Sequence, residues 1–381
     1  MMLFHGGRKL DAKGEVDKFW MTVDAGVITA TGSGTPPRSG PHAGSADTVD
    51  LAGRWLVPGF IDLHGHGGGG HSFDGSAADI RSALAVHRAH GTTRSVISLV
   101  TAPLAELHSS LATIADLVAD DPLILGSHLE GPFLSAGNRG AHDPSFLRSP
   151  EPAEVEALIG AARGTLRQLT IAPELTGAFE AMDVLVEAGV AVAIGHTEVS
   201  FDLARRAFDR GARILTHAFN AMPGIHHRAP GPVIAAFQDE RVVLELILDG
   251  KHVHQAVAML AFEAAPDRIA LITDAMAAAG SVDGDYTLGS LNVTVRDGLA
   301  TVSGTSTIAG STLTQDSAFR RAMQDVRVSP RRAIAALTQV PARALGLDHR
   351  LGLLAPGYVA DAVALDHEFQ VSAVWADGER I

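Results

Sequence analysis

The sequence predicts an α/β fold, a (β/α)8 barrel of the TIM type with a small β-sandwich domain built from both chain ends. Eight short apolar runs with the composition of buried strands recur along the 381 residues, and amphipathic stretches separate most of them. Strand–helix alternation repeated eight times is typical of a parallel barrel. An open doubly wound sheet is the alternative, but no G-x-G-x-x-G motif opens a helix here. We place the barrel at residues 58–351, with a β-hairpin inserted near residues 285–303, and the small domain at residues 1–57 and 352–381.

The elements of the predicted barrel follow one another in a regular order. The eight predicted strands are residues 57–63, 93–100, 123–129, 166–172, 190–194, 212–215, 242–248 and 268–273. The predicted helices between them are residues 77–89, 105–118, 151–162, 177–187, 202–210 and 255–264. The helical stretches are amphipathic, whereas the strand runs are short, largely apolar and rich in β-forming residues.

The two ends of the chain have a different pattern. Residues 20–50 and 357–381 contain short stretches of alternating polar and apolar residues with glycine turns, which predict the strands of the small domain. Residues 36–44 are predicted to form a surface loop. A polar hairpin over residues 286–302, with a turn at Asp297-Gly298, is expected after the last barrel strand.

Composition excludes several classes of function. The net charge of −13 and the lack of a Lys/Arg cluster argue against a nucleic-acid partner. The chain has no cysteine, so it has no disulfide, no thiolate zinc site and no cysteine nucleophile. Residues 1–15 lack the apolar core of a signal peptide, and no apolar run is long enough to span a bilayer. We therefore expect a cytoplasmic protein without a membrane partner.

Polar residues follow the predicted barrel strands, where the active site of such a barrel lies. The first strand leads into His64-Gly65-His66, and side chains two residues apart on a strand point to the same face. The other strand ends carry His128 with Glu130, Glu174, His196, His217, Asp249 with His252, and Asp274. Each residue alone has an ordinary structural explanation, such as a hydrogen-bonded histidine or a helix cap. Together, imidazoles and carboxylates converging on one barrel mouth predict a site for Zn²⁺ or a similar divalent ion.

The lysine positions restrict how two metals could be bridged. Many two-metal barrel hydrolases use a carboxylated lysine, but no lysine occurs between Lys18 and Lys251. None of the first six predicted strands can therefore supply one. Any bridge must come from a carboxylate, for which Glu130 is the best placed and Glu174 the weaker alternative.

Seven motifs occur in order along the chain: Pro-Gly-Phe-Ile-Asp at 58–62, His-Leu-Glu-Gly-Pro-Phe at 128–133, Gly-Ala-His-Asp-Pro at 140–144, Gly-His-Thr at 195–197, Thr-His-Ala-Phe-Asn-Ala-Met-Pro at 216–223, Asp-Gly-Lys-His at 249–252 and Thr-Asp-Ala at 273–275. Together with the His-x-His pair they resemble the N-acetylglucosamine-6-phosphate deacetylases of the amidohydrolase superfamily. The resemblance covers nearly the whole chain.

The resemblance implies a metal centre and a catalytic acid. Glu130, His196 and His217 match the metal ligands of the family, and Asp274 matches its catalytic acid/base. His64 and His66 stand where some members have Gln and Asn and bind one metal, which implies that this chain can bind two ions. The implied metal is zinc, with iron, cobalt and manganese as alternatives.

The resemblance also implies a substrate and a reaction. The residues that match sugar-phosphate contacts are Ala141, His142, Asn220, Ala221, Arg228, His252 and Ile308 in the 308–311 loop. The implied reaction is removal of the acetyl group from N-acetyl-D-glucosamine 6-phosphate by a metal-activated hydroxide, with Asp274 as general base and acid. This activity belongs to amino sugar catabolism and cell-wall recycling. The family also implies a homodimer, in which Arg228 acts either in its own subunit or in its neighbour.

Three alternatives remain at this point. The N-acetylgalactosamine 6-phosphate epimer would suit the same motifs, and another amidohydrolase activity is a second possibility. A non-catalytic binding protein that keeps the barrel is the third. Residues 134–139 are small and polar, which is typical of a mobile lid over such a site. We give His71 an ordinary structural explanation, although it lies close to His66 in the sequence.

Overall fold

The computed structural model of the chain describes residues 1–36 and 47–381, so the predicted loop at 36–44 lies almost entirely outside the described residues. The chain divides into two compact units. One consists of Met1–Ile61, His87–Arg94 and Gln315–Ile381, and the other of Asp62–Val86 and Ser95–Thr314. The domain limits drawn from the sequence stay a prediction. No helix in the described part of the chain is both long and apolar enough to cross a membrane.

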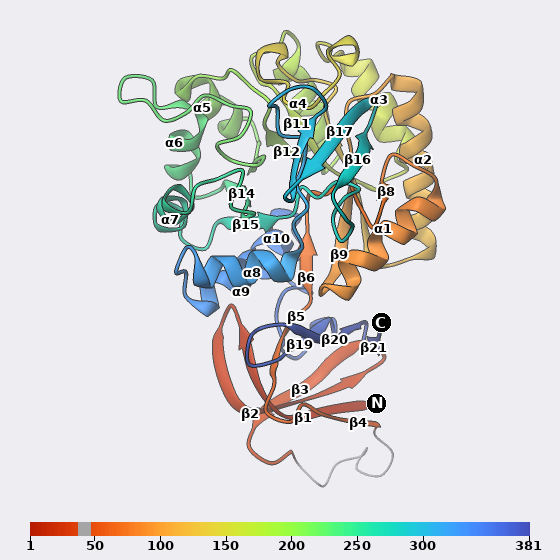
Figure 1. The fold of residues 1–381 in the computed structure, drawn as a ribbon, viewed down its shortest axis with the longest axis vertical. Coiled ribbons are helices and arrows are strands. Elements are labelled where there is room, and N and C mark those ends of the chain that lie inside the picture. The colour runs from red at the N-terminus through yellow and green to blue at the C-terminus, as the bar shows by residue number, and fades with distance from the viewer. Residues whose placement is uncertain (37–46) are drawn as a thin grey trace. The chain divides into compact units, whose positions relative to one another are not determined.

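Eight strands form the barrel sheet and follow one another in chain order (Figure 1). They are β6 (Phe60–Asp62), β9 (Thr92–Leu99), β10 (Ile124–Glu130), β11 (Leu166–Ile171), β12 (Ala191–Ile194), β13 (Ile214–Leu215), β14 (Val243–Ile247) and β15 (Ile269–Ile272). All neighbouring pairs from β9 to β15 are parallel. Just after β15, the Asp274 amide donates to the His64 carbonyl at 2.8 Å, and the His66 amide donates to the Ala275 carbonyl at 2.7 Å. These bonds link the first and last strands, which confirms a barrel over an open sheet.

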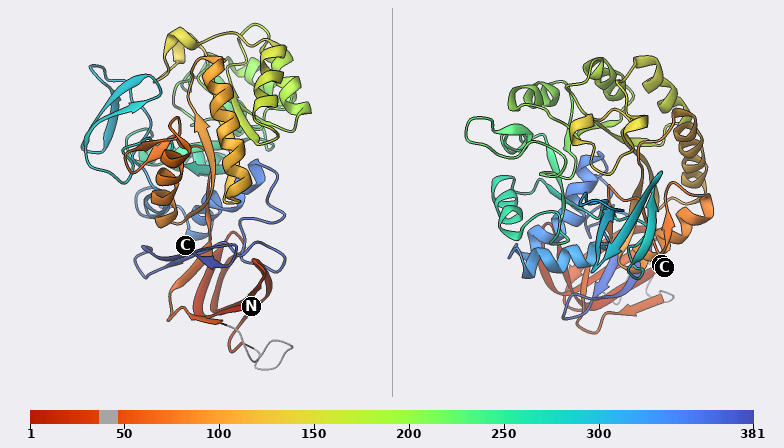
Figure 2. Two further views of the ribbon diagram at one scale, coloured as in Figure 1. Left: turned by 90° about the vertical axis from the view of Figure 1, so that its right-hand side faces the viewer. Right: turned by 45° about the horizontal axis from the view of Figure 1, so that its top comes forward.

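Seven helices follow the first seven barrel strands and surround them (Figure 2). They are α1 (Ala77–Ala89), α2 (Leu104–Asp120), α3 (Pro152–Ala161), α4 (Ala178–Glu187), α5 (Phe201–Asp209), α6 (Gly231–Phe237) and α7 (Gln255–Ala264). The six predicted helices are all present. Helix α6 was not predicted, because it has only seven residues and most of them are buried, which leaves no polar face to mark it.

Helices α8 (Gln315–Gln324), α9 (Pro330–Leu337) and α10 (Gln339–Ala344) were also missing from the sequence prediction. They belong to the unit that contains both chain ends. The α9–α10 boundary is a single residue, Thr338, whose backbone leaves the helical region with φ −133° and ψ −77°. A break this short leaves no glycine or proline cluster in the sequence to mark it.

The same unit contains an eight-stranded sheet built from both chain ends, as expected for the small domain. Its strands are β1 (Met2–Asp11), β2 (Gly14–Asp24), β3 (Val27–Ser33), β4 (Asp47–Asp50), β5 (Trp55–Pro58), β19 (Ala362–Leu365), β20 (Val371–Ala376) and β21 (Glu379–Arg380). Strand β5 joins the two ends, since it pairs with β1 on one side and β19 on the other. Phe4, Met21, Ile28, Leu56 and Trp375 are among the buried residues of its core.

A three-stranded antiparallel sheet follows the last barrel strand. It comprises β16 (Gly284–Leu288), β17 (Leu291–Arg296) and β18 (Leu299–Val302). Asp297 and Gly298 connect β17 to β18 with φ of 50° and 67°. Two consecutive residues with positive φ are what a tight type I′ hairpin turn requires. Buried residues of this sheet, including Leu288, pack with Val100 and Met276 of the barrel unit.

Candidate metal and active site

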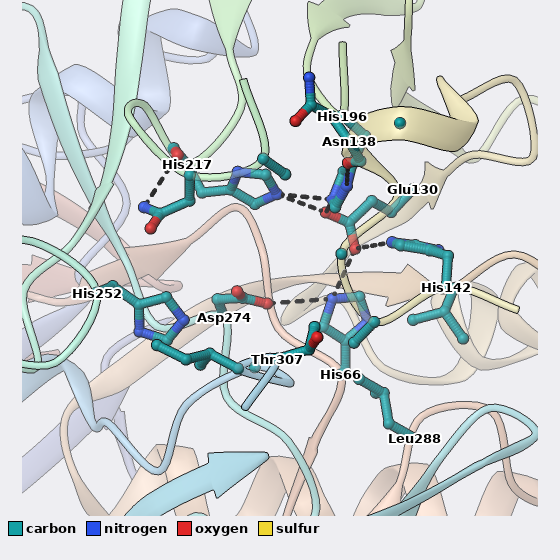
Figure 3. Close-up of a pocket in the computed structure, with 18 residues that line it drawn as sticks. His66, Glu130, Asn138, His142, His196, His217, His252, Asp274, Leu288 and Thr307 are labelled. Atoms are coloured by element: carbon teal, nitrogen blue, oxygen red, sulfur yellow. Dashed lines mark hydrogen bonds and ion pairs between the residues drawn. The ribbon is translucent and has the colours of Figure 1, made fainter. Parts of the chain in front are cut away.

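A cavity of about 300 Å³ opens at the carboxyl ends of the barrel strands. Its lining includes six buried potential metal ligands or acids: His66, Glu130, His142, His196, His217 and Asp274 (Figure 3). The structure therefore brings together side chains that are up to 208 positions apart in the sequence, from His66 to Asp274. All of them are buried.

The backbone conformation at three of these residues sets the direction of their side chains. His196, His217 and Asp274 each lie two residues after the last residue of β12, β13 and β15, and their φ angles are 47°, 26° and 47°. Residues other than glycine rarely adopt positive φ, which costs on the order of 1–3 kcal/mol each and is commonest at functional sites. The cost of these turns indicates that the positions of the His196, His217 and Asp274 side chains serve function rather than stability.

Glu130, the last residue of β10, lies at the centre of the cluster (Figure 3). Its Oε1 is 3.1 Å from His196 Nε2, 3.0 Å from His217 Nε2 and 3.3 Å from His64 Nε2. Its Oε2 is 3.2 Å from His66 Nε2. The two carboxylate oxygens thus face different histidines, which is the arrangement that a carboxylate bridging two ions requires.

Two compact groups of potential ligands result from this arrangement. One is formed by His64, His66 and Asp274, and the other by Glu130, His142 and His196. Within each group the ligand atoms all lie within 4.8 Å of one another. Each group therefore suits one ion, and the two groups are adjacent because Glu130 contacts both.

Hydrogen bonds to the other ring nitrogens show that the cluster fits a cation. His196 Nδ1 is 3.0 Å from the Asn138 carbonyl oxygen, which can only accept, so Nδ1 carries the proton. His64 Nδ1 is 3.2 Å from the Glu245 carboxylate in the same way. In the neutral rings, the Nε2 lone pairs of both histidines then point at the Glu130 carboxylate. Facing acceptors at such distances repel one another unless a cation lies among them.

The charges of the cluster favour the same conclusion. Burial opposes the charged form of His66, but hydrogen bonds to Asp274 and Glu130 outweigh it and raise its pKa to about 9. Burial would raise the pKa of Asp274, but the hydrogen bond from His66 and the nearby His64 hold it well below its usual value. Asp274 is therefore a carboxylate near neutral pH, and the site as a whole attracts positive charge.

His142 differs from the other histidines in its hydrogen bonds. The Thr101 amide donates to His142 Nδ1 at 3.3 Å, and Thr101 Oγ1 lies 2.9 Å from the same atom. Because an amide can only donate, Nδ1 is the acceptor and Nε2 carries the proton. Nε2 lies 3.4 Å from Glu130 Oε2 in the cavity, so His142 is better suited to donate to a ligand than to bind a metal.

The segment 134–139, for which we predict a mobile lid, is hydrogen-bonded to the loop that carries His196. The Ser135 amide donates to the His196 carbonyl at 2.9 Å, and Ser135 Oγ donates to Glu198 at 2.9 Å. Asn138 Nδ2 donates to the Thr197 carbonyl at 2.7 Å. The segment thus supports His196, and a lid function for it stays a prediction.

We expect Asn138→Ala to weaken this support. The substitution removes the bond to Thr197, which lowers the free energy of unfolding by about 1 kcal/mol. Looser packing around the carbonyl at 138 should also weaken metal binding through His196, by roughly 10-fold. Thermal denaturation and metal titration measure the two effects. Arg139→Ala is the control, since Arg139 is on the same segment and its side chain donates to the Ala136 carbonyl rather than to the His196 loop. Equal losses in both variants would contradict the expectation.

Five of the remaining predicted site residues line the cavity: Ala141, Asn220, Ala221, His252 and Ile308. Arg228 is exposed instead, and its Nη1 lies 2.7 Å from His227 Nε2. His71 pairs with Asp79 at 2.8 Å, in agreement with an ordinary structural role. Glu174 accepts bonds from Thr197 Oγ1 and the Glu198 amide, so it braces the loop after β12.

Sequence reasoning missed several residues that support the site. They are Thr101, the carbonyl of Asn138, Glu245 and the apolar cavity residues Val100 and Leu288. Glu245 could have been found, because it is a single acid within the apolar run 242–248. A carboxylate in a buried strand is costly unless it is hydrogen-bonded, so its position indicates a specific partner. The backbone contact of Asn138 leaves no signal in residue types.

Comparison with known proteins shows where this arrangement belongs. A model of the amidohydrolase family matches residues 55–381. The chain belongs to the amidohydrolase family. N-acetylgalactosamine-6-phosphate deacetylase of Escherichia coli O157:H7 is 43% identical over 377 residues, which are 98% of this amidohydrolase and 97% of that protein. Human N-acetylglucosamine-6-phosphate deacetylase is 37% identical over 349 residues, 87% of this chain and 84% of the human protein.

Solved structures give the same picture. A mutant of N-acetyl-D-glucosamine-6-phosphate deacetylase from Mycobacterium smegmatis, in complex with N-acetyl-D-glucosamine-6-phosphate, superposes with a TM-score of 0.94 at 42% identity. The match covers 100% of this amidohydrolase and 98% of that chain. The family is metal-dependent, and the described residues contain two groups of candidate ligands for it.

Proposed function

We propose that this amidohydrolase removes the acetyl group from N-acetyl-D-glucosamine 6-phosphate and releases D-glucosamine 6-phosphate and acetate. The observation that carries the proposal is the position of Asp274, which lines the cavity and lies 3.3 Å from His66 Nε2 in the ligand cluster. A base beside a metal site is what hydrolysis of an unactivated amide needs. The similar proteins from Escherichia coli, human and Mycobacterium smegmatis all bear the names of amino-sugar-6-phosphate deacetylases.

The proposed ligands are Glu130, His196 and His217 for one divalent ion, with His64 and His66 for a second. Imidazole and carboxylate ligands suit zinc, and also iron, cobalt or manganese. When bound, such an ion supplies two effects: it lowers the pKa of a coordinated water from 15.7 to roughly 7, and it polarises the acetyl carbonyl. Glu130 lies between the two ligand groups and is the proposed bridge.

Asp274 is the proposed proton carrier. Its low pKa keeps it as a carboxylate, so it can take a proton from the attacking water while the water oxygen bonds to the acetyl carbon. As the carbon–nitrogen bond breaks, Asp274 returns the proton to the leaving nitrogen, which departs as the amine of the sugar. His142, with its proton on Nε2, is placed to donate to the acetyl oxygen.

The residues proposed to hold the sugar phosphate are Ala141, His142, Asn220, Ala221, Arg228, His252 and Ile308. Burial disfavours the charged form of His252, but its hydrogen bond to Asp249 raises the pKa of the imidazole, which favours a cation facing a phosphate. A guanidinium is suited to forked contacts with phosphate. Because Arg228 is exposed, we propose that it serves the site of a second copy in a homodimer.

The test is acetate release by purified protein supplied with Zn²⁺. We expect turnover of N-acetyl-D-glucosamine 6-phosphate and little release from N-acetylglucosamine without the phosphate. Preferential hydrolysis of a cyclic amide or an N-acyl amino acid would replace the proposal with another amidohydrolase activity. No release from any acylated compound would favour a binding protein.

A second candidate substrate is the galactosamine epimer, because the similar Escherichia coli protein is an N-acetylgalactosamine-6-phosphate deacetylase. The ratio of kcat/KM for the two epimers decides between them. We also propose that the protein is a cytoplasmic enzyme of amino sugar catabolism and cell-wall recycling, and that it has no nucleic-acid or membrane partner.

A further inference from the structure

Glu245 is a charged residue at the centre of the barrel interior. It is the middle residue of β14, Val243–Ile247, and its side chain is fully buried. The other residues of the strand are apolar. Burying a carboxylate costs several kcal/mol unless hydrogen bonds compensate for the lost water. The contacts of Glu245 therefore indicate which function its buried carboxylate serves.

Every polar partner of Glu245 can donate a hydrogen bond. Gln168 Nε2 donates to its Oε1 at 2.8 Å. The His217 amide donates to its Oε2 at 3.4 Å, and His64 Nδ1 lies 3.2 Å from the same oxygen. Since an ionised carboxylate only accepts, the proton of a neutral His64 must be on Nδ1.

This bond decides which His64 nitrogen faces the ligand cluster. With Nδ1 protonated, the Nε2 lone pair is free and points toward His66 Nε2 at 3.1 Å and Glu130 Oε1 at 3.3 Å. In the opposite tautomer Nε2 would carry a proton and could not bind a metal. His66 has no comparable support, because its Nδ1 lacks a hydrogen-bond partner within the described residues.

We propose that Glu245 is a positioning residue that holds His64 in the metal-binding tautomer and so controls occupancy of the second ion site. The proposal deepens the proposed function, since it rests on His64 and His66 holding a second divalent ion. Glu245 itself is not among the described residues that line the cavity.

Two substitutions at this position separate the hydrogen bond from the charge. Glu245→Met keeps the volume of the side chain and removes the acceptor. Glu245→Gln keeps an acceptor for His64. Its amide can also be accommodated, because Gln168 Oε1 has no partner in the described part of the chain and can accept from it after a flip of the Gln168 amide.

The control is Thr170→Val. Thr170 is fully buried in the same barrel interior and bonds to His128 and Thr216 rather than to His64. It therefore reports the general effect of losing a polar group from the barrel core. Circular dichroism and thermal melting establish that each variant is folded before metal is measured.

The experiment counts zinc per chain and measures affinity by competition with a chelating dye, without substrate. We expect E245M to bind the second ion about 10–100-fold more weakly, with the first ion retained, and E245Q and T170V to stay within about 3-fold of wild type. Histidine-labelled NMR of the metal-free protein, at a pH high enough for the His64 ring to be neutral, should show the His64 proton on Nδ1 in wild type and E245Q, with that signal lost in E245M. Two tightly bound ions in a folded E245M would overturn the proposal.

A double-mutant cycle with His64→Gln tests whether Glu245 acts on metal binding through His64. If Glu245 acts through His64, adding E245M to H64Q should not weaken zinc binding further. Additive losses would instead assign its effect to the His217 amide and overturn the proposal. Because these measurements need no substrate, failure of the proposed deacetylase activity would appear separately, as normal metal behaviour with no acetate release.

Discussion

Replacing Asp274 with Asn lowers kcat for acetate release by roughly 10²–10⁴-fold, the usual contribution of a general acid–base group. The amide has nearly the same shape as the carboxylate but cannot take a proton from water or return one to the leaving amine. Asp274 is suited to both steps, because it lines the cavity and its pKa is held well below the usual value. The expected phenotype is a folded protein that still binds substrate.

The measurement is single-turnover and steady-state acetate release with excess Zn²⁺, since Asp274 also lies 3.3 Å from His66 Nε2. Metal counting on the same sample separates lost proton transfer from lost metal. Asp143→Asn is the control: it removes an exposed carboxylate that caps the 3-10 helix at Pro144–Phe146. Full turnover by D274N would show that another group carries the proton.

Replacing Glu130 with Gln should remove both ions. Its two oxygens face different histidines, at 3.0 Å from His217 Nε2 and 3.2 Å from His66 Nε2. A Gln side chain offers one oxygen and an NH₂ group, whose hydrogens oppose any cation at that position. We expect metal content below one ion per chain and no measurable turnover.

Thermal stability provides an independent readout of Glu130→Gln. A ligand at 100 times its Kd stabilises the folded state by about 2.7 kcal/mol, so Zn²⁺ should raise the Tm of wild type and EDTA should lower it again. E130Q should show neither shift. Glu174→Gln is the matched control, because Glu174 braces the Thr197–Glu198 turn and should leave both shifts in place. Wild-type metal affinity in E130Q would remove Glu130 from the site.

Much of the fold was predictable because the barrel strands have a strong local signal. Strands such as β14 and β15 are short, mostly apolar and buried along their whole length, and α2 and α5 present clear amphipathic faces. One of the missed helices, α6, lacks that signal. Helix α6 is short and mostly buried, so its sequence does not distinguish it from a loop or strand.

The candidate site was predictable in its ligand types but not in its geometry. In a parallel barrel all strands end on the same side, and the active site lies at that end. This rule places Glu130, His196 and Asp274 at one mouth of the barrel. It says nothing of the left-handed backbone at His196 and Asp274, or of the carbonyl at Asn138 that orients a ring. It also could not separate His142 as a donor from the neighbouring histidines.

The sequence by itself determined the barrel and the His-x-His pair, and it left Glu130 rather than a lysine to bridge any two ions. These follow from local periodicity, strand polarity and the absence of lysine between positions 18 and 251. Only the tertiary structure decided which nitrogen of each histidine faces the cluster. That choice depends on hydrogen bonds that His64 donates to Glu245 and that His196 donates to the Asn138 carbonyl, between partners 181 and 58 residues apart. A tautomer is set by whichever acceptor folding brings to the ring, and no spacing within one strand encodes it.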